Sequence, residues 1–341
     1  MEPLFVGLDV SKDETAISVR TQSGSVKSAY KKATDPDAIY RALMSELELI
    51  RCVVLETGRM ATWLYNELSL RGLPIVCIDA RQAHAVLSQM HNKTDKNDAA
   101  MLAELARTGF YKRIEVKSRV SQERRALLRA REVAIKSRLN VENTIRGLLA
   151  SFGIRLPKYL KTYDQRVRTA LEGQSDLMRI IMPLLRLRTE ALRQAAALTK
   201  DMVRQAQMNE TCRRLMTIPG IGAVSAVTYV ATIDTPDRFA HSRSVGAYIG
   251  LTSRKYQSGD IDYNGRISRR GDQMLRAVLY EAANSLLCRV KSGLGQRLRD
   301  WAIALKKRTS HKKAVVALAR KLAVIMHAIW KDGTEFEPRG A

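Results

Sequence analysis

The sequence predicts an α/β domain at the amino terminus, followed by helical segments that fill the rest of the 341-residue chain. Up to about residue 115, short apolar runs alternate with helical patterns, which is typical of a sheet with parallel members. After Ser118 the strand signals stop, and residues 121–151 are rich in Arg, Leu, Ala and Glu. The expected fold class is therefore α/β plus α, with a mixed sheet first and a mainly helical carboxy-terminal domain.

The amino-terminal domain is expected to hold five strands and three helices. Its first strand is a buried apolar run, and the next two strands flank a turn at residues 22–24. Its last helix carries Thr94 and Asp95 at its start and stops at Gly109. The expected strands are residues 4–10, 14–21, 25–31, 51–58 and 73–80, and the expected helices are residues 36–49, 60–72 and 93–109.

Two long helices are expected in the middle of the chain, over residues 121–151 and about 175–215. Apolar residues recur at heptad spacing in the second helix, which favours a helical hairpin or coiled coil, with an ordinary helical bundle as the alternative. These residues are Leu177, Leu184, Ala191 and Leu198. Pro183 is expected to kink this helix or to mark its start.

The last part of the chain begins at the sequence IPGIG (218–222) and is expected to be mainly helical to about Trp330. The expected domains are residues 1–115, a helical or coiled-coil segment at 116–211, a carboxy-terminal domain at 212–335 and a flexible tail at 336–341.

Positive charge dominates the composition. The net charge is +24, and residues 241–320 hold 17 Lys or Arg against 5 Asp or Glu. A protein this basic usually binds a polyanion, most often nucleic acid, although a ribosome-associated or merely very soluble protein is the alternative. Aromatic residues make up 6% of the chain, so charge rather than base stacking should dominate the contact.

The compartment is predicted from the cysteines and from the amino terminus. The four cysteines lie far apart and form no CxxC pair, so we expect free thiols in a reducing compartment. The first residues are too acidic for a signal peptide, and no apolar run is long enough to span a membrane. We therefore expect a cytoplasmic protein that binds no membrane.

Four carboxylates form the strongest chemical pattern. Asp9 ends the first strand and Glu56 ends the fourth, while Asp95 and Asp98 are three residues apart at a helix start and share one face. Four oxygen donors without sulfur or imidazole suit Mg²⁺. Two such ions could bind one phosphodiester and stabilise both the attacking and the leaving oxygen.

Each part of this pattern has an ordinary alternative. Asp95 and Asp98 could be helix N-terminal acids favoured by the helix dipole. Asp9 could belong to an actin-like phosphotransferase, although the high positive charge and the missing glycine-rich adenosine loop disfavour that class. The combination is typical of ribonuclease-H-like nucleases, including the RuvC-type junction resolvases.

Four segments resemble one family, the DEDD transposases of bacterial insertion sequences (the IS110 group), which are RNA-guided recombinases. The first three are GLDVSK (7–12), VLETG (54–58) and KTDKNDAAMLAE (93–104). The fourth is the block that runs from IPGIG through DRFAHSRSVGAYIGLTSRKYQSG to RISRRGDQMLRAVLY. KTDxxDAxMLAE and GLTxRxYxSG are long and specific, and the match spans both ends of the chain.

The resemblance implies a RuvC-like domain in which Asp9, Glu56, Asp95 and Asp98 bind metal. It also implies that Ser258 is the nucleophile and forms a phosphoserine intermediate with DNA. A structured guide RNA of the bridge RNA type, target and donor DNA, a dimer and a synaptic tetramer are implied in the same way.

The residues alone do not choose this serine. Ser242, Ser244 and Ser268 are local alternatives, Ser253 stands where relatives often have proline, and Ser258 itself could be a simple turn residue before Gly259.

Several further residues are candidate nucleic-acid contacts. Gly220 and Gly222 of IPGIG resemble the hairpin of a helix-hairpin-helix motif, in which backbone N–H groups approach phosphate, although a plain helix–turn–helix connection fits equally well. Basic side chains that flank the candidate serine should contact DNA phosphates, with a solvated surface as the alternative. These are Arg254, Lys255, Arg266, Arg269 and Arg270. A second basic set, suited to RNA or DNA, is Arg124, Arg125, Arg129 and Arg131.

The expected function is therefore that of a Mg²⁺-dependent serine recombinase which excises and inserts its own element under the direction of a guide RNA. One alternative is a metal-only nuclease of the junction-resolvase kind, in which water attacks and Ser258 is incidental. Another is a non-catalytic nucleic-acid-binding protein.

Overall fold

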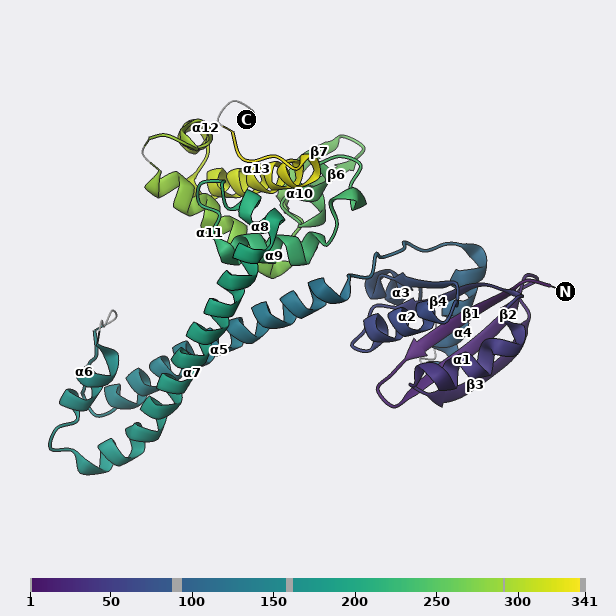
Figure 1. The fold of residues 1–341 in the computed structure, drawn as a ribbon, viewed down its shortest axis with the longest axis horizontal. Helices are drawn as coiled ribbons and strands as arrows, with labels where there is room; N and C mark the ends of the chain where they lie inside the picture. Colours follow the sequence, from purple (N-terminus) through teal and green to yellow (C-terminus); the bar gives the residue numbers. More distant parts are fainter. Residues whose placement is uncertain (1, 88–93, 158–161, 291, 338–341) are drawn as a thin grey trace. The chain divides into compact units, whose positions relative to one another are not determined.

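The computed structural model describes residues 2–87, 94–157, 162–290 and 292–337, and it divides into two compact units, residues 1–117 and 118–341 (Figure 1). Lys93, at the start of the expected helix 93–109, lies outside the described residues. The boundaries expected at residues 115 and 211 stay predictions.

The amino-terminal unit is built on a five-stranded sheet in the order β3-β2-β1-β4-β5. The central strand β1 pairs antiparallel with β2 and parallel with β4. A mixed sheet was predicted, and it is confirmed. The strands are β1 (Leu4–Val10), β2 (Glu14–Thr21), β3 (Val26–Ala33), β4 (Ile50–Glu56) and β5 (Ile75–Ile78).

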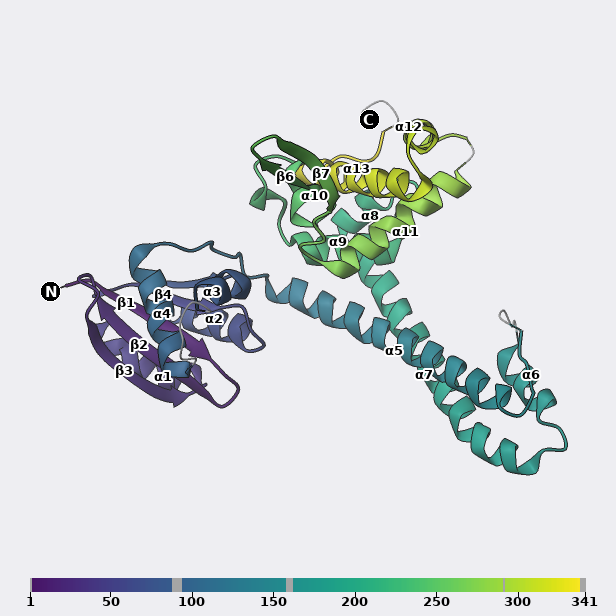
Figure 2. The same cartoon turned by 180° about the vertical axis from the view of Figure 1, so that it is seen from behind.

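Helices cover both faces of this sheet (Figures 1 and 2). Leu4, Val6 and Leu8 point to one face and share a core with residues of α1 and α2. Phe5 and Val54 point to the other face and pack against α4. The helices are α1 (Pro36–Leu43), α2 (Ala61–Leu70), α3 (Ala80–Leu87) and α4 (Asp95–Thr108). The helix expected over residues 36–49 is shorter than predicted, since it ends at Leu43 and continues only as a 3₁₀ turn, Met44–Glu46.

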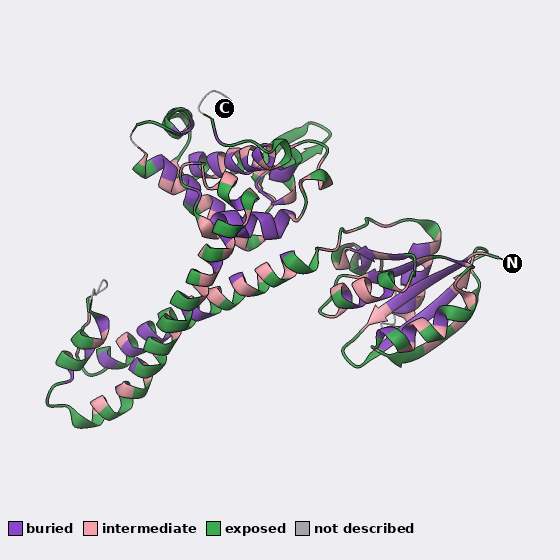
Figure 3. Cartoon of the chain, viewed as in Figure 1, coloured by how far each residue is buried: buried purple, intermediate pink, exposed green. Residues whose placement is uncertain are grey.

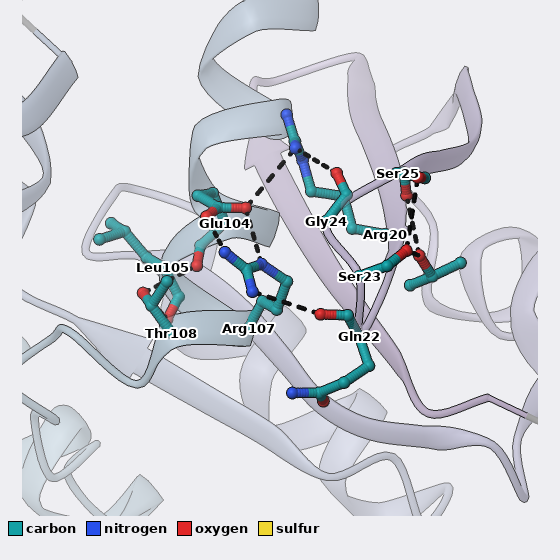
Figure 4. A network of polar contacts seen from close by, with 10 residues as sticks. Arg20, Gln22, Ser23, Gly24, Ser25, Glu104, Leu105, Arg107 and Thr108 are labelled. Carbon is teal, nitrogen blue, oxygen red and sulfur yellow. Dashed lines mark hydrogen bonds and ion pairs between the residues drawn. The ribbon is translucent and has the colours of Figure 1, made fainter.

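Gly7 lets α4 lie directly on β1. A Cβ at this position would come within 2.2 Å of the Ala99 carbonyl oxygen and 2.3 Å of the Ala103 nitrogen. A strand glycine often marks such a close backbone approach. Near the other end of α4, Glu104 forms an ion pair with Arg20 of β2 at 3.5 Å (Figure 4). Glu104 also accepts a hydrogen bond from Arg107 of the same helix.

In the carboxy-terminal unit, two long helices, α5 (Arg119–Ala150) and α7 (Ser175–Met208), pack along each other. The short helix α6 (Tyr163–Ala170) joins their core. The helix α7 is continuous through Pro183, so the proline does not mark a helix start, and the expected kink stays a prediction. Buried Ile181 and Leu185 flank the proline and pack in the core that α7 shares with α5 and α6.

The predicted second long helix ends at Asn209, whose side chain caps a separate helix, α8 (Glu210–Leu215). The residues of α7 that are buried against neighbouring elements include Ala195 and Met202, whereas the four heptad positions are only half-buried. A helical hairpin is confirmed, and the coiled-coil description stays a prediction.

The rest of this unit is a helical core of buried apolar residues (purple in Figure 3). Phe336, expected at the start of a flexible tail, is buried against this core, and its backbone N–H donates to Thr217. The elements are α9 (Ala223–Ile233), a 3₁₀ turn (Pro236–Arg238), α10 (Ser244–Tyr248), β6 (Ser253–Ser258), β7 (Ile261–Ile267), α11 (Gln273–Arg289), α12 (Gln296–Arg308) and α13 (His311–Asp332).

The carboxy-terminal part is mainly helical, as predicted, and the β6–β7 hairpin is an addition that was not predicted from the sequence. Its strands pair antiparallel, and every residue of β6 is exposed. Among the described residues, no helix has the length and apolarity needed to cross a membrane.

Candidate active site

Asp9 and Glu56 lie side by side at one edge of the sheet. In the parallel pair β1–β4, Leu8 is opposite Leu55, and the two carboxylates follow one residue later on each strand. Both side chains are half-buried. Because side chains alternate along a strand, Asp9 shares its face with Gly7, and Glu56 shares its face with Val54. That is the face covered by α4.

The first turn of α4 adds Asp95 and Asp98 to the same edge. Thr94 caps this helix, and its hydroxyl accepts a hydrogen bond from the Asn97 N–H at 3.2 Å. Ala99 and Ala103 pack on Gly7, while Leu102, Leu105 and Ala106 share a core with Phe5. The helix therefore runs against the direction of β1, and its amino-terminal turn lies towards Asp9.

Lys31 of β3 places an ammonium group among these carboxylates. Its Nζ lies 2.7 Å from Asp95 Oδ2 and 3.8 Å from Glu14. The hydrogen bond with Asp95 is the main cause that raises the pKa of Lys31, and the charge of Asp9 contributes to the same shift. The same bond lowers the pKa of Asp95. Sequence reasoning missed Lys31, because nothing in its spacing ties it to the carboxylates.

The donor chemistry at this edge fits a hard divalent cation. The four carboxylates supply only oxygen, and the Cys77 thiol on β5 is unsuited to bind metal, since burial and then the charge of Glu56 raise its pKa to about 11. In the described ranges, no group of three acidic, histidine or cysteine side chains has the closeness of a metal site. The strands and α4 direct the four acids towards one edge without the closeness of a metal site, and Lys31 is the cation that pairs with Asp95 there.

Ser258 is the last residue of β6, opposite Ile261, and a two-residue turn at Gly259 and Asp260 joins it to β7. Gly259 has a φ of 53°, a conformation that glycine adopts easily. Ser258 is exposed, and among the described residues its hydroxyl has no hydrogen-bond partner. It belongs to the carboxy-terminal unit, whereas the carboxylates belong to the amino-terminal unit.

Comparison with known proteins decides the family. A DEDD transposase model of the IS110 group matches residues 6–154, and the model described as Transposase IS116/IS110/IS902 family matches residues 212–298. The chain is 30% identical over 330 residues to the transposase for insertion sequence element IS1111A of Coxiella burnetii, covering 95% of this chain and 89% of that protein. The chain belongs to the IS110 family of transposases.

Other relatives agree with this family. The transposase for insertion sequence element IS1328 of Yersinia enterocolitica is 25% identical, with 97% of this chain and 98% of that protein covered. The pilin gene-inverting protein of Moraxella bovis is 26% identical, with 75% of this chain and 72% of that protein covered. The protein is therefore an insertion-sequence transposase that acts on DNA, its DEDD domain is RuvC-like, and its family typically uses a divalent metal.

The other local serines of the transposase differ from Ser258 in their surroundings. Ser242 is hydrogen-bonded to the buried His327 at 2.9 Å, and the second ring nitrogen of this histidine lies 2.9 Å from the Pro236 carbonyl oxygen. The hydroxyl of Ser268 accepts a bond from the Arg270 N–H. Ser244 begins α10, and Ser253 lies at the base of the hairpin, opposite Ile267.

The basic residues near Ser258 are all exposed. Arg254 donates to the Ser268 carbonyl oxygen, and Lys255 lies 3.2 Å from Asp262 across the hairpin. Arg269 has a positive φ of 53°, in a loop packed so closely that a Cβ on Gly250 would meet the Arg270 backbone at 2.0 Å. Arg269 and Arg270 thus lie in a closely packed loop, whereas the other three basic residues lie on the hairpin strands, and the contact of all five with DNA stays a prediction.

The basic set on α5 has partners within the chain. Arg125 pairs with Asp272 at 2.7 Å, Arg129 pairs with Glu132 at 2.7 Å, and Arg131 donates to Thr199. Arg124 lies near the buried Cys212, where its charge partly opposes the effect of burial on the pKa of that thiol. Nucleic-acid binding by these four arginines stays a prediction, and Arg125 also joins α5 to the start of α11.

The two glycines of IPGIG lie in the connection between α8 and α9. Gly220 has a φ of 88°, and a Cβ there would come within 2.7 Å of the Ala282 carbonyl oxygen. The close packing of this residue on α11 therefore accounts for a glycine at this position. Gly222 caps α9 and has open space around its Cα. A phosphate contact by this connection stays a prediction.

Proposed function

We propose that this transposase cuts and rejoins DNA through a phosphoserine at Ser258, with Mg²⁺ bound by Asp9, Glu56, Asp95 and Asp98. The observation that supports this proposal is that the fold directs all four carboxylates towards one edge of the sheet, on the face covered by α4. Two come from the ends of neighbouring parallel strands, and two come from a helix that Gly7 admits onto the same face.

The carboxylates would hold the metal, which would supply positive charge for the phosphodiester and for the oxygen atoms that attack and leave. Lys31 would give up its bond with Asp95 when the metal binds.

Ser258 would act in two steps, a cleavage step and a joining step. Its oxygen attacks phosphorus and loses its proton, while the bond from phosphorus to a deoxyribose oxygen breaks and that oxygen gains a proton. One phosphodiester bond is exchanged for another, so the joining step needs no external source of energy. A hydroxyl of a second strand then attacks the phosphoserine, and the serine regains its proton. The exposure of Ser258 at a hairpin turn supports this role, because DNA can reach the hydroxyl.

A structured guide RNA, a dimer and a synaptic tetramer complete the proposal. The family resemblance implies them, and the net charge of +24 favours the binding of two polyanions at once. The cytoplasmic location is part of the same proposal.

The test is a search for a protein–DNA adduct that survives denaturation, after incubation with target and donor DNA, guide RNA and Mg²⁺. We expect Ser258→Ala to lose the adduct and to keep nucleic-acid binding. Ser253→Ala, an exposed serine at the other end of the same strand, is the matched control and should keep the adduct. An adduct that persists in Ser258→Ala refutes the serine assignment.

The metal site has a test of its own. Asp95→Asn should lose DNA cleavage, and full cleavage by that variant overturns the four-carboxylate site. Cleavage that persists in Ser258→Ala without an adduct would support the alternative, a metal-only nuclease. Omission of the guide RNA should abolish cleavage of the target, and guide-independent cleavage would remove the RNA from the proposal.

A further inference from the structure

Two tyrosines lie on the same face of the β6–β7 hairpin as Ser258. Tyr256 is opposite Tyr263 in the register, and Ser258 is opposite Ile261. Since side chains alternate along each strand, these four residues share one face, and Lys255, Gln257, Asp262 and Asn264 share the other.

The two tyrosine rings are stacked, with centroids 5.0 Å apart and planes inclined by 19°. Both rings are unusually open to solvent, since Tyr256 is 43% exposed and Tyr263 is 56% exposed. Ile261 beside them is also 56% exposed. In a chain with 6% aromatic residues, an exposed aromatic pair next to a candidate nucleophile is a distinctive surface.

The stacked pair of tyrosines packs on a glycine of β7. A Cβ on Gly265 would come within 2.8 Å of the Tyr256 ring, so this ring lies over the glycine that follows its partner by two residues. The same diagonal relation places Tyr263 beside Ser258, because Tyr263 follows Ile261 by two residues. Tyr256 is therefore the supported ring, and Tyr263 lies diagonally across the hairpin from Ser258.

We propose that Tyr263, supported by Tyr256, stacks on a nucleobase next to the phosphodiester that Ser258 attacks, and so positions that phosphate. This proposal rests on the proposed role of Ser258. A nucleobase is the occupant that fits, because an aromatic face stacks on any base and the surrounding charge suits a phosphate backbone. The hairpin and the loop after it carry Arg254, Lys255, Arg266, Arg269 and Arg270 against Asp260 and Asp262.

Stacking and chemistry can be measured separately. A 2-aminopurine is placed in the DNA beside the cleaved phosphodiester, and the full complex is formed with guide RNA and with protein that also carries Ser258→Ala, so that no bond is cut. We expect 2-aminopurine fluorescence to fall on binding, to fall equally with Tyr263→Phe and Tyr263→Trp, and to stay high with Tyr263→Leu. Leucine fills the space without an aromatic face.

In protein with Ser258 intact, Tyr263→Leu should form the adduct about tenfold more slowly than Tyr263→Phe. Asn264→Ala, on the opposite face of the same hairpin, is the matched control and should match the unaltered protein in both measurements. Equal fluorescence and equal adduct rates in Tyr263→Leu and Tyr263→Phe would overturn the proposal. So would an effect of Tyr263→Leu on the oligomeric state alone, since it would make this face a protein interface.

The two proposals fail in different ways. If the adduct persists in Ser258→Ala, the serine role is lost, while the fluorescence series still reports whether Tyr263 stacks on a base. If the adduct depends on Ser258 but the 2-aminopurine fluorescence is the same in all Tyr263 variants, only the stacking proposal is lost.

Discussion

Lys31 gives the carboxylate cluster a positive charge of its own before any metal ion binds. Its ammonium group pairs with Asp95, with 2.7 Å between Nζ and Oδ2, and its raised pKa keeps it charged across the neutral range. A divalent cation that binds Asp95 has to displace this group. The lysine therefore neutralises Asp95 without metal and should compete with metal for that carboxylate.

We expect Lys31→Met to bind Mn²⁺ about twofold to fivefold more tightly, because an exposed ion pair no longer competes for Asp95. Isothermal titration calorimetry without DNA measures this directly. Lys32→Met is the matched control, since the ammonium of Lys32 lies over the Tyr30 ring instead. Unchanged or weaker binding in Lys31→Met would show that the lysine does not compete with the ion.

The residues of the candidate site differ in how far sequence alone could place them. Asp9 and Glu56 follow apolar strands, and the ends of neighbouring parallel strands meet at one edge, so their closeness was predictable. Lys31 lies on a strand of mixed polar residues, and only the sheet order brings it to Asp95. Gly7 was visible in GLDVS, but a lone glycine does not say which helix will pack on it.

At the scale of elements, the contact of α4 with β1 decides where two of the four carboxylates lie. Gly7→Ala should destabilise the amino-terminal unit by about 3 kcal/mol, because the added methyl group overlaps the α4 backbone. Urea denaturation measures the loss. Gly58→Ala, where a Cβ finds its nearest neighbour 4.0 Å away, should change little. Equal stability of the two variants would mean that α4 does not need this close approach.

The hairpin of α5 and α7 is tied together by a buried acid. Glu142 of α5 lies 2.9 Å from Arg188 of α7 and 3.1 Å from Arg138, and Arg188 also pairs with Asp164 of α6. Arg188→Met should cost about 2–3 kcal/mol of unfolding free energy, because a buried carboxylate loses a partner.

Chemical denaturation followed by circular dichroism tests this expectation. Arg193→Met removes an arginine of the same helix whose partner, Glu190, is exposed, and it should have a small effect. A loss in Arg188→Met no greater than in Arg193→Met would contradict the structural role of Glu142.

The β6–β7 hairpin explains why part of the fold was not predictable. Strands are found in a sequence when one face is buried and apolar residues alternate. Here every residue of β6 is exposed, and the strand sequence SRKYQS has no apolar face. The long helices were predicted because buried residues recur along them, but the packing that carries α7 through Pro183 comes from residues far apart in the chain.

For the molecule as a whole, the excess of positive charge should dominate affinity for nucleic acid. We expect the dissociation constant for DNA to rise more than about a hundredfold between 50 and 200 mM salt, measured by fluorescence anisotropy. Replacing both Arg269 and Arg270 by glutamine should lower the slope of log K against log salt by about 2. Arg193→Gln, on α7, should leave the slope unchanged. A flat salt response would count against polyanion binding.

The carboxylates and Ser258 belong to different compact units, so the proposed reaction would require one unit to meet the other, in the same chain or in a partner chain. The proposed dimer predicts that they meet between chains. Ser258→Ala and Asp98→Asn should each be inactive alone, and a mixture of the two should regain cleavage and the covalent adduct, because a mixed dimer holds one complete site. The double variant, which carries Ser258→Ala and Asp98→Asn in one chain, is the matched control and should stay inactive. If the mixture of single variants also stays inactive while both proteins bind DNA and assemble normally, the site is built within one chain.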